Sequence, residues 1–235
     1  MCGTGFGFSV EKEEVNKLPE VPVIKSGQGV ETIPIYDSKA GWADSVKMLM
    51  ENIYGGQNIY FDYSGIRPEG ARLHTMGGRA SGPAPLIKLH DFIRETMHNA
   101  QGRKLTTLEA HDICNQIAEI VVVGGVRRSS QISLSDLDDK DMRHAKEWPF
   151  PIKRAMANNS AIFREKPSAA QFLREWALLA LSGTGERGIF NLDAAQKKAP
   201  SRRYAPLIQG TNPCGEIMLR DMEFCNLSEV VVRAE

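Results

Sequence analysis

Three side chains suited to chemistry stand at alternate positions near the end of the sequence: Asn212, Cys214 and Glu216. In an extended segment this spacing places an amide, a thiol and a carboxylate on the same side of the chain. The carboxylate can take a proton, and the amide can hold a hydroxyl group. Pro213 and Gly215, which separate them, restrict the backbone and leave room for a ligand to approach. The spacing therefore predicts a reaction centre in this segment.

The residues near Cys214 indicate which reactions its thiol can perform. A carboxylate close to a thiol disfavours the thiolate, and no histidine lies near Cys214 in the sequence. These features argue against a nucleophile of the Cys–His kind. Cys225 begins a segment expected to form a neighbouring strand, so that the two sulfurs could face one site. The commoner alternative is that both cysteines are buried as small apolar side chains.

Helices with apolar residues at helical spacing are expected around this centre. One lies between Ser38 and Gly55 and another spans residues 86–99. Capping boxes that start at Thr106 and at Ser168 predict two more. The spacing predicts inward-facing residues in these last two helices, namely Ile113, Ile117 and Ile120 in the first and Leu173, Trp176, Ala177 and Ala180 in the second.

Short strands are expected between the helices, at residues 58–63, 131–135, 160–164 and 189–191. Helices that alternate with short strands are typical of an α/β fold with parallel strands. No internal repeat or low-complexity linker interrupts the chain, so we expect one domain. The loop from Ser64 to Pro85 is long and rich in Gly and Pro, and such loops in compact domains are functional or disordered.

The composition of the 235 residues excludes several classes of protein. The 29 Lys and Arg balance 29 Asp and Glu, whereas a general nucleic-acid binder needs surplus positive charge. An apolar share of 42% with 25% charged residues is typical of a globular protein and not of a disordered chain. The four cysteines lack zinc-ligand or disulfide-scaffold spacing. The five histidines lack metal spacing, and we expect them at the surface or at helix caps. No apolar run supports a membrane span.

The order of several motifs adds a resemblance to a known family. Residues 211–217 followed by residues 225–227 closely resemble the active-site signature of ribonucleotide reductases, most of all the adenosylcobalamin-dependent (class II) type. Further stretches match the same family in the same order, and together the matches cover essentially the whole chain. These stretches are residues 3–8, 41–44, 64–71, 77–83, 124–129, 156–160 and 185–189.

The resemblance implies part of a ten-stranded α/β barrel with a central finger loop that carries the radical cysteine. Cys214 matches the family's thiyl-radical cysteine, which abstracts the 3′ hydrogen of the ribose; a protonated thiol fits this role. Glu216 matches the base toward the 3′ hydroxyl, and Asn212 matches the amide that hydrogen-bonds the substrate. Cys225 matches one of the two cysteines that reduce the 2′ position and end as a disulfide.

The resemblance also implies that residues 1–235 are a single segment from the central part of the barrel domain. In the family, the second redox cysteine lies before the Gly-rich opening stretch, so we expect Cys2 and Cys114 to be structural. The late barrel strands, a phosphate-binding loop and a C-terminal cysteine pair would lie beyond Glu235. The two ends of the chain, which look like cut strands, fit this expectation that the flanking parts are absent.

Two stretches match the family's allosteric specificity region, where glycines let the backbone approach a base and arginines can stack or pair with phosphate. Taken alone, the second stretch, residues 124–130, is more typical of a solvated, inert basic turn than of a binding loop. One departure is Arg187, since the family commonly has Pro at that position, which leaves the local loop geometry open. The candidate substrate- or effector-binding residues are Gly77, Gly78, Ser81, Gly124, Gly125, Arg127, Arg128 and Ser129.

The function implied by the resemblance is the reduction of ribonucleotides to 2′-deoxyribonucleotides for DNA synthesis, by thiyl-radical chemistry under nucleotide control. Adenosylcobalamin would be the cofactor, with its site outside this segment and with no metal ligands here. The expected partners are a ribonucleotide substrate, a nucleotide effector and a thioredoxin-like reductant, without nucleic acid or membrane, in a cytoplasmic monomer or homodimer.

Three alternatives remain open at this stage. The chain could belong to the large subunit of a metal-dependent (class I) reductase, in which a separate subunit supplies the radical. It could also be an inactive nucleotide-binding fragment of either type. A dinucleotide-dependent oxidoreductase would rest on the opening glycines alone, which do not form the G-x-G-x-x-G pattern.

Overall fold

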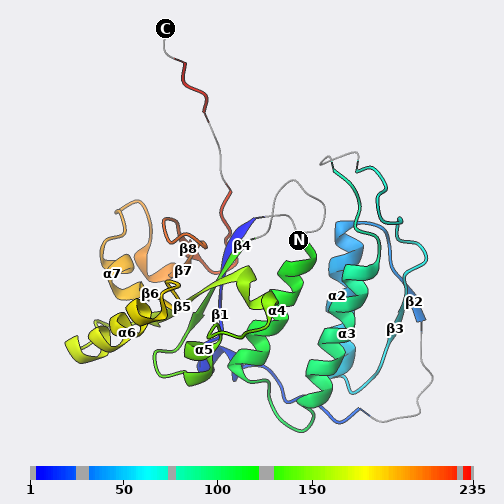
Figure 1. Cartoon of the computed structure of the whole chain (residues 1–235), viewed down its shortest axis with the longest axis horizontal. Helices are drawn as coiled ribbons and strands as arrows, with labels where there is room; N and C mark the ends of the chain where they lie inside the picture. Colours follow the sequence, from blue (N-terminus) through cyan, green and yellow to red (C-terminus); the bar gives the residue numbers. More distant parts are fainter. Residues whose placement is uncertain (1–3, 25–31, 74–77, 122–129, 227–229, 234–235) are drawn as a thin grey trace.

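The computed structural model describes residues 4–24, 32–73, 78–121, 130–226 and 230–233, and Figure 1 labels its elements. The α-helices are α1 (Lys12–Val15), α2 (Lys39–Tyr54), α3 (Ala84–Asn99), α4 (Thr107–Val121), α5 (Lys140–His144), α6 (Ala169–Ser182) and α7 (Leu192–Lys197). The strands are β1 (Gly5–Ser9), β2 (Thr32–Pro34), β3 (Tyr60–Asp62), β4 (Ser130–Ser135), β5 (Ala157–Phe163), β6 (Gly188–Asn191), β7 (Ile208–Thr211) and β8 (Met218–Arg220). Short 3-10 helices, η1 (Ile152–Met156) and η2 (Ala205–Leu207), precede β5 and β7.

The central sheet contains four parallel strands in the order β1-β4-β5-β6. Helix α5 lies in the connection from β4 to β5, and α6 lies in the connection from β5 to β6. Parallel neighbours need such crossover connections, because a tight turn can join only antiparallel strands. The sheet confirms the predicted α/β class with parallel strands.

The helices begin where local capping residues satisfy their first free N–H groups. The Ser38 hydroxyl accepts a hydrogen bond from the Gly41 N–H at the start of α2. A reciprocal pair of hydrogen bonds between Thr106 and Glu109 starts α4, and a full capping box that begins at Ser168 starts α6. These contacts confirm the predicted helix starts.

Two apolar cores hold the described residues together. The larger core lies among α2, α3 and α4, which stand side by side in Figure 1, and it includes Leu49, Leu89 and Ile113. The smaller core joins the central sheet to α7 and β7 through Ile132, Leu134, Ile162, Leu192 and Ile208. The second core fixes the hairpin of β7 and β8 against the sheet, and this hairpin carries the predicted reaction centre.

The structure contradicts the predicted inward face of α6. Leu173, Trp176, Ala177 and Ala180 are all exposed, and Glu175 is the buried residue of this helix. Ion pairs from Glu175 attach the helix to the body, so its apolar side chains face away from the described residues. The periodic pattern identified a helix correctly but could not tell which side another element covers.

The expectation of surface or capping histidines is wrong for two of the five. His90 on α3 and His111 on α4 are fully buried. His90 contacts the Ser45 and Tyr63 hydroxyl groups, and the His111 ring contacts Ser133 and Asn115. Burial favours the neutral ring and lowers the pKa to about 3 for His90 and to about 4 for His111, where the Asp112 charge opposes the effect.

Candidate active site

The predicted reaction centre lies in the loop that connects the antiparallel strands β7 and β8. The loop is a turn, because the Gly215 N–H donates a 3.0 Å hydrogen bond to the Asn212 carbonyl. Gly215 has a φ of +84°, a left-handed conformation that favours glycine. The segment is therefore not extended, and the expectation that alternate residues share one strand face is wrong.

The turn nevertheless brings two of the predicted side chains together. Asn212, which is 2% exposed, donates a 2.7 Å hydrogen bond from Nδ2 to Oε1 of Glu216. Its Oδ1 accepts the Ile217 N–H at 3.0 Å, which closes the base of the loop. A buried amide needs partners for both of its ends. Asn212 therefore holds the loop closed and orients the Glu216 carboxylate, while Glu216 itself stays exposed.

The two cysteines of the predicted site lie at different depths. Cys214 is exposed at the tip of the turn, between Asn212 and Glu216 in sequence. Cys225 is partly buried, and its sulfur lies 3.7 Å from Nδ2 of Asn212. Asn212 thus contacts both Glu216 and Cys225, so that one amide links the proposed base to the proposed redox thiol.

Strand β1 lies directly against Cys225. The backbone of Gly5 pairs with that of Cys225 in an antiparallel bridge, in which the Cys225 N–H donates to the Gly5 carbonyl at 2.8 Å. A Cβ atom at position 5 would lie 2.6 Å from the Cys225 sulfur and 3.1 Å from the Pro213 ring. Only glycine at this position leaves the sulfur where it lies.

One contact to the loop was not anticipated from the sequence. Nδ2 of Asn158, near the start of β5, donates a 2.7 Å hydrogen bond to the carbonyl of Pro213. Asn158 belongs to a stretch that matched the family, residues 156–160, but no role was attached to it there. The family motif was the available sequence signal for Asn158. No local pattern shows its partner, because Pro213 lies 55 residues further along the chain.

The remaining cysteines do not join this site in the described residues. Cys114 lies on α4, and burial raises the pKa of its thiol to about 11, which fits the expected structural role. Cys2 lies outside the described residues. Across the ranges that the structure describes, no group of three or more His, Cys, Asp or Glu side chains could hold a metal ion.

A hollow lies beside the hairpin and not at its tip. It has a volume of about 990 Å³ and is lined by parts of β1, β7 and β8, including Phe6, Phe8 and Leu219. Thr211 borders it, but residues 212–217 do not. Cys214 therefore does not line this hollow, and the hollow is separate from the predicted reaction centre.

Comparisons with known proteins show which family the chain belongs to. Two family models match: the insertion domain of B12-dependent ribonucleotide reductases over residues 23–97, and the barrel domain of ribonucleotide reductases over residues 126–234. Adenosylcobalamin-dependent ribonucleoside-triphosphate reductases of Lacticaseibacillus paracasei and Lactobacillus delbrueckii subsp. bulgaricus are 32% and 33% identical over 98% of this chain. A crystal structure of a B12-dependent (class II) ribonucleotide reductase matches 94% of the chain with a TM-score of 0.80 and 28% identity. The chain belongs to the B12-dependent ribonucleotide reductase family.

The chain matches only part of the length of its relatives in this reductase family. The chain spans 36% of the length of the curated relatives and of the matched crystal structure. The insertion-domain match contains β2, α2, β3 and most of α3, and the barrel-domain match contains β4 to β8. No repeat or low-complexity linker marks the insertion in the sequence. The expectation of one continuous barrel segment over residues 1–235 stays a prediction.

Only two of the predicted effector-binding residues of this reductase chain lie among the described residues. Gly78 has a φ of +82°, and its carbonyl accepts the Leu73 N–H. Ser81 is partly buried just before α3 and donates to the Gly82 carbonyl. The contacts between residues 70–73 and residues 78–80 close a small hairpin in the long loop. The other predicted positions, Gly77, Gly124, Gly125, Arg127, Arg128 and Ser129, lie outside the described residues.

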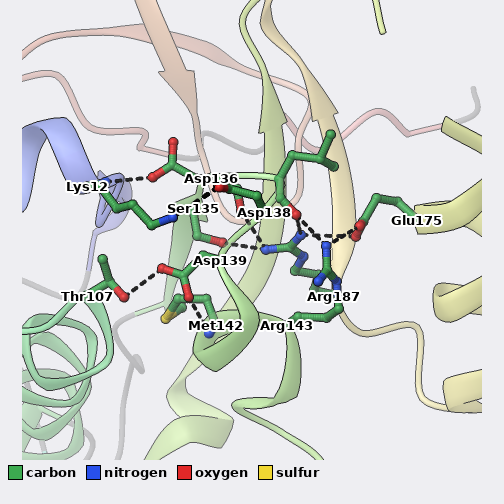
Figure 2. Close-up of polar contacts among 11 residues, drawn as sticks. Lys12, Thr107, Ser135, Asp136, Asp138, Asp139, Met142, Arg143, Glu175 and Arg187 are labelled. Carbon is green, nitrogen blue, oxygen red and sulfur yellow. Dashed lines mark hydrogen bonds and ion pairs between the residues drawn. The ribbon is translucent and has the colours of Figure 1, made fainter. Parts of the chain in front are cut away.

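Arg187, the departure from the family's proline, lies in a buried ion cluster (Figure 2). Its guanidinium donates to Glu175 at 3.0 Å and to the backbone carbonyls of Asp136 and Leu137 at 2.9 and 2.7 Å. Arg143 on α5 binds the other oxygen of Glu175 at 2.6 Å. Burial lowers the pKa of Arg187, and the Glu175 carboxylate opposes this effect. Arg187 thus joins α5, α6 and the end of β4 and does not face the reductase site.

Proposed function

We propose that the protein containing this chain reduces ribonucleotides to 2′-deoxyribonucleotides by thiyl-radical chemistry. The observation that carries the proposal is the contact of one buried amide, Asn212, with both Glu216 and Cys225, beside an exposed Cys214. The similarity to class II reductases supports this function over that of a class I large subunit. The relatives' names support a ribonucleoside triphosphate as the substrate.

Each residue of the site has a distinct role in this mechanism. Cys214, as a thiyl radical, takes the hydrogen atom from C3′ of the ribose, and its exposure at the tip of the turn allows a substrate to reach it. Glu216 takes the proton of the 3′ hydroxyl, and Asn212 keeps the carboxylate oriented for this step. Cys225, with a second cysteine, reduces the 2′ position, and the two thiols end as a disulfide.

Adenosylcobalamin is the proposed cofactor. When bound, it supplies the radical chemistry, which the side chains of a protein cannot start by themselves. The residues fit it in one respect, because the exposed thiol of Cys214 is open to a radical source beside the loop. No other described residue is assigned to the cofactor.

Control and supply of reducing equivalents complete the proposal. We propose that a nucleotide effector binds near the hairpin of residues 70–80, since Gly78 and Ser81 match the family's specificity region. A thioredoxin-like reductant would restore the thiol of Cys225 after each turnover. We expect the protein to work in the cytoplasm as a monomer or homodimer. Among the helices that the structure describes, none is long and apolar enough to cross a membrane.

The decisive test is Cys214→Ala in the complete polypeptide that carries this sequence. We expect ribonucleotide reduction to be abolished, because alanine has no sulfur that could carry the radical. Effector binding should stay unchanged. Cys114→Ala is the matched control, since Cys114 lies on α4 away from the site, and it should keep its activity. Product formation with and without adenosylcobalamin is measured by chromatography. Substantial reduction by Cys214→Ala would remove Cys214 from the mechanism, and activity that requires iron and a second subunit would exclude the cobalamin proposal.

A further inference from the structure

Strand β5 contains a residue, Asn158, that contacts the Cys214 loop from outside the hairpin. Ala157 and Asn159 are buried, whereas Asn158 between them is exposed. Alternate residues of a strand point to opposite faces of the sheet. The Asn158 side chain therefore points to the face opposite that of Ala157 and Asn159, and it donates its 2.7 Å hydrogen bond to the Pro213 carbonyl.

The hydrogen bond from Asn158 reaches the loop at the residue directly before Cys214. Pro213 is buried and directly precedes Cys214, and its carbonyl belongs to the peptide unit that begins the Cys214 backbone. Thr211 and Asn212 close the base of the turn through their contacts with Ile217. Asn158 instead holds the tip side of the loop against the central sheet.

The backbone around Asn158 is itself fixed on both sides by one ion pair. Lys146 pairs with Glu186 at 2.5 Å, and both side chains are largely buried. Lys146 also donates to the Ala157 carbonyl, and the Asn159 N–H donates to the second Glu186 oxygen at 3.1 Å. The residues before and after Asn158 are thus held by the same pair, which leaves the Asn158 amide little freedom to move.

From this geometry we propose that Asn158 is a positioning residue for Cys214, supported by the Lys146–Glu186 pair. The proposal rests on the proposed function of Cys214. A hydrogen-atom transfer depends on the approach of the sulfur to C3′, and a displacement of about 1 Å from a reacting geometry can cost about 100-fold in rate. Asn158 contacts neither sulfur nor Glu216 in the structure, so it acts through the Pro213 carbonyl.

The test compares Asn158→Ala and Asn158→Asp with Asn158→Gln in the complete polypeptide. The first two remove the donor, and Asn158→Gln keeps an amide N–H on a longer side chain. We expect the first two to speed hydrogen exchange of the Gly215 and Ile217 amides about five- to tenfold, as expected for the loss of one hydrogen bond. They should also lower kcat about tenfold or more with KM unchanged. Asn158→Gln should restore part of both losses.

The matched control is Ser168→Ala, which removes the N-cap of the exposed helix α6. It should cost a similar amount of stability but leave loop exchange and kcat unchanged. If Asn158→Ala behaves like Ser168→Ala, Asn158 is only structural and the proposal is overturned. The hydrogen-exchange measurement needs no cofactor or substrate. A failure of the proposed function would appear separately, as reduction by Cys214→Ala, and it would leave the faster loop exchange of the Asn158 variants unaffected.

Discussion

At the scale of single residues, the site depends on direct contacts between its members. Asn212 places one amide between Glu216 and Cys225, and Gly5 allows the Cys225 sulfur to lie against β1. The backbone of Gly5 does not have a positive φ, so it could accept a side chain without strain. The demand for glycine there comes from the sulfur and from the nearby Pro213 ring.

Gly5→Ala therefore tests the position of Cys225 directly. The added Cβ would lie 2.6 Å from the sulfur, so we expect the sulfur to move and turnover with a dithiol reductant to fall about tenfold or more. The free energy of unfolding should fall by about 1–3 kcal/mol. The measurements are steady-state reduction and urea unfolding of the complete polypeptide.

Gly65→Ala is the control, because a Cβ there would meet only the Ile35 carbonyl at an ordinary 3.5 Å. It should change neither turnover nor the rate at which iodoacetamide alkylates Cys225. Equal alkylation rates in Gly5→Ala and the unchanged protein would mean that Gly5 does not fix this sulfur.

The sequence indicated the members of the proposed site but not their geometry. The residue types and order of Asn212, Cys214, Glu216 and Cys225 were sufficient to suggest radical chemistry by resemblance. The turn was not predictable from alternate spacing, since it depends on the left-handed Gly215 and on the Gly215–Asn212 hydrogen bond. The contact of Asn158 with Pro213 depends on the sheet register, which no local pattern contains.

At the scale of elements, features that depend on local contacts were predictable from the sequence, whereas features that depend on distant contacts were not. The starts of α4 and α6 were predictable because a cap and its partner lie three residues apart. The orientation of α6 was not, because it is fixed by the Arg143–Glu175–Arg187 cluster (Figure 2), whose members come from three separate segments. An amphipathic pattern shows that a helix has an apolar side but does not show what covers it.

The cluster predicts a large effect for one substitution. Glu175→Ala leaves two buried guanidinium groups, those of Arg143 and Arg187, without their carboxylate. Loss of one member of a buried ion pair costs about 3–5 kcal/mol, so we expect a decrease of this size in the free energy of unfolding. Urea unfolding followed by circular dichroism measures it.

Arg174→Ala on the same helix is the comparison, since Arg174 is exposed and its loss should cost less than about 0.5 kcal/mol. A loss below about 1 kcal/mol in Glu175→Ala would show that α6 is not anchored by this cluster. The arginine side chains would then be compensated by water or by the protein's other groups.

At the scale of the whole molecule, two buried histidines tie separate layers together. His90 joins α3 to α2 through Ser45 and to the segment after β3 through Tyr63. His111 joins α4 to β4 through Ser133, and Asn115 extends this contact to Gln131. The sequence could not place these residues, because a lone histidine carries no sign of its burial. Their neutral rings make the stability of the molecule depend on pH.

The direction of this dependence follows from the lowered pKa values. A histidine has a pKa near 6.5 when unfolded, whereas the folded values are about 3 for His90 and about 4 for His111. The unfolded chain therefore binds more protons between pH 6.5 and these values. The stabilisation from each neutral histidine is full above pH 6.5 and falls as the pH decreases through that window.

Between pH 7.5 and 5.5, each histidine should lower the free energy of unfolding by about 1.3 kcal/mol, before most carboxylates titrate. Urea unfolding of the unchanged protein should show the sum of both losses. The variants His90→Gln and His111→Gln should each be less stable at pH 7.5 but lose less on acidification. An equally steep pH dependence in the double variant would assign the effect to other groups.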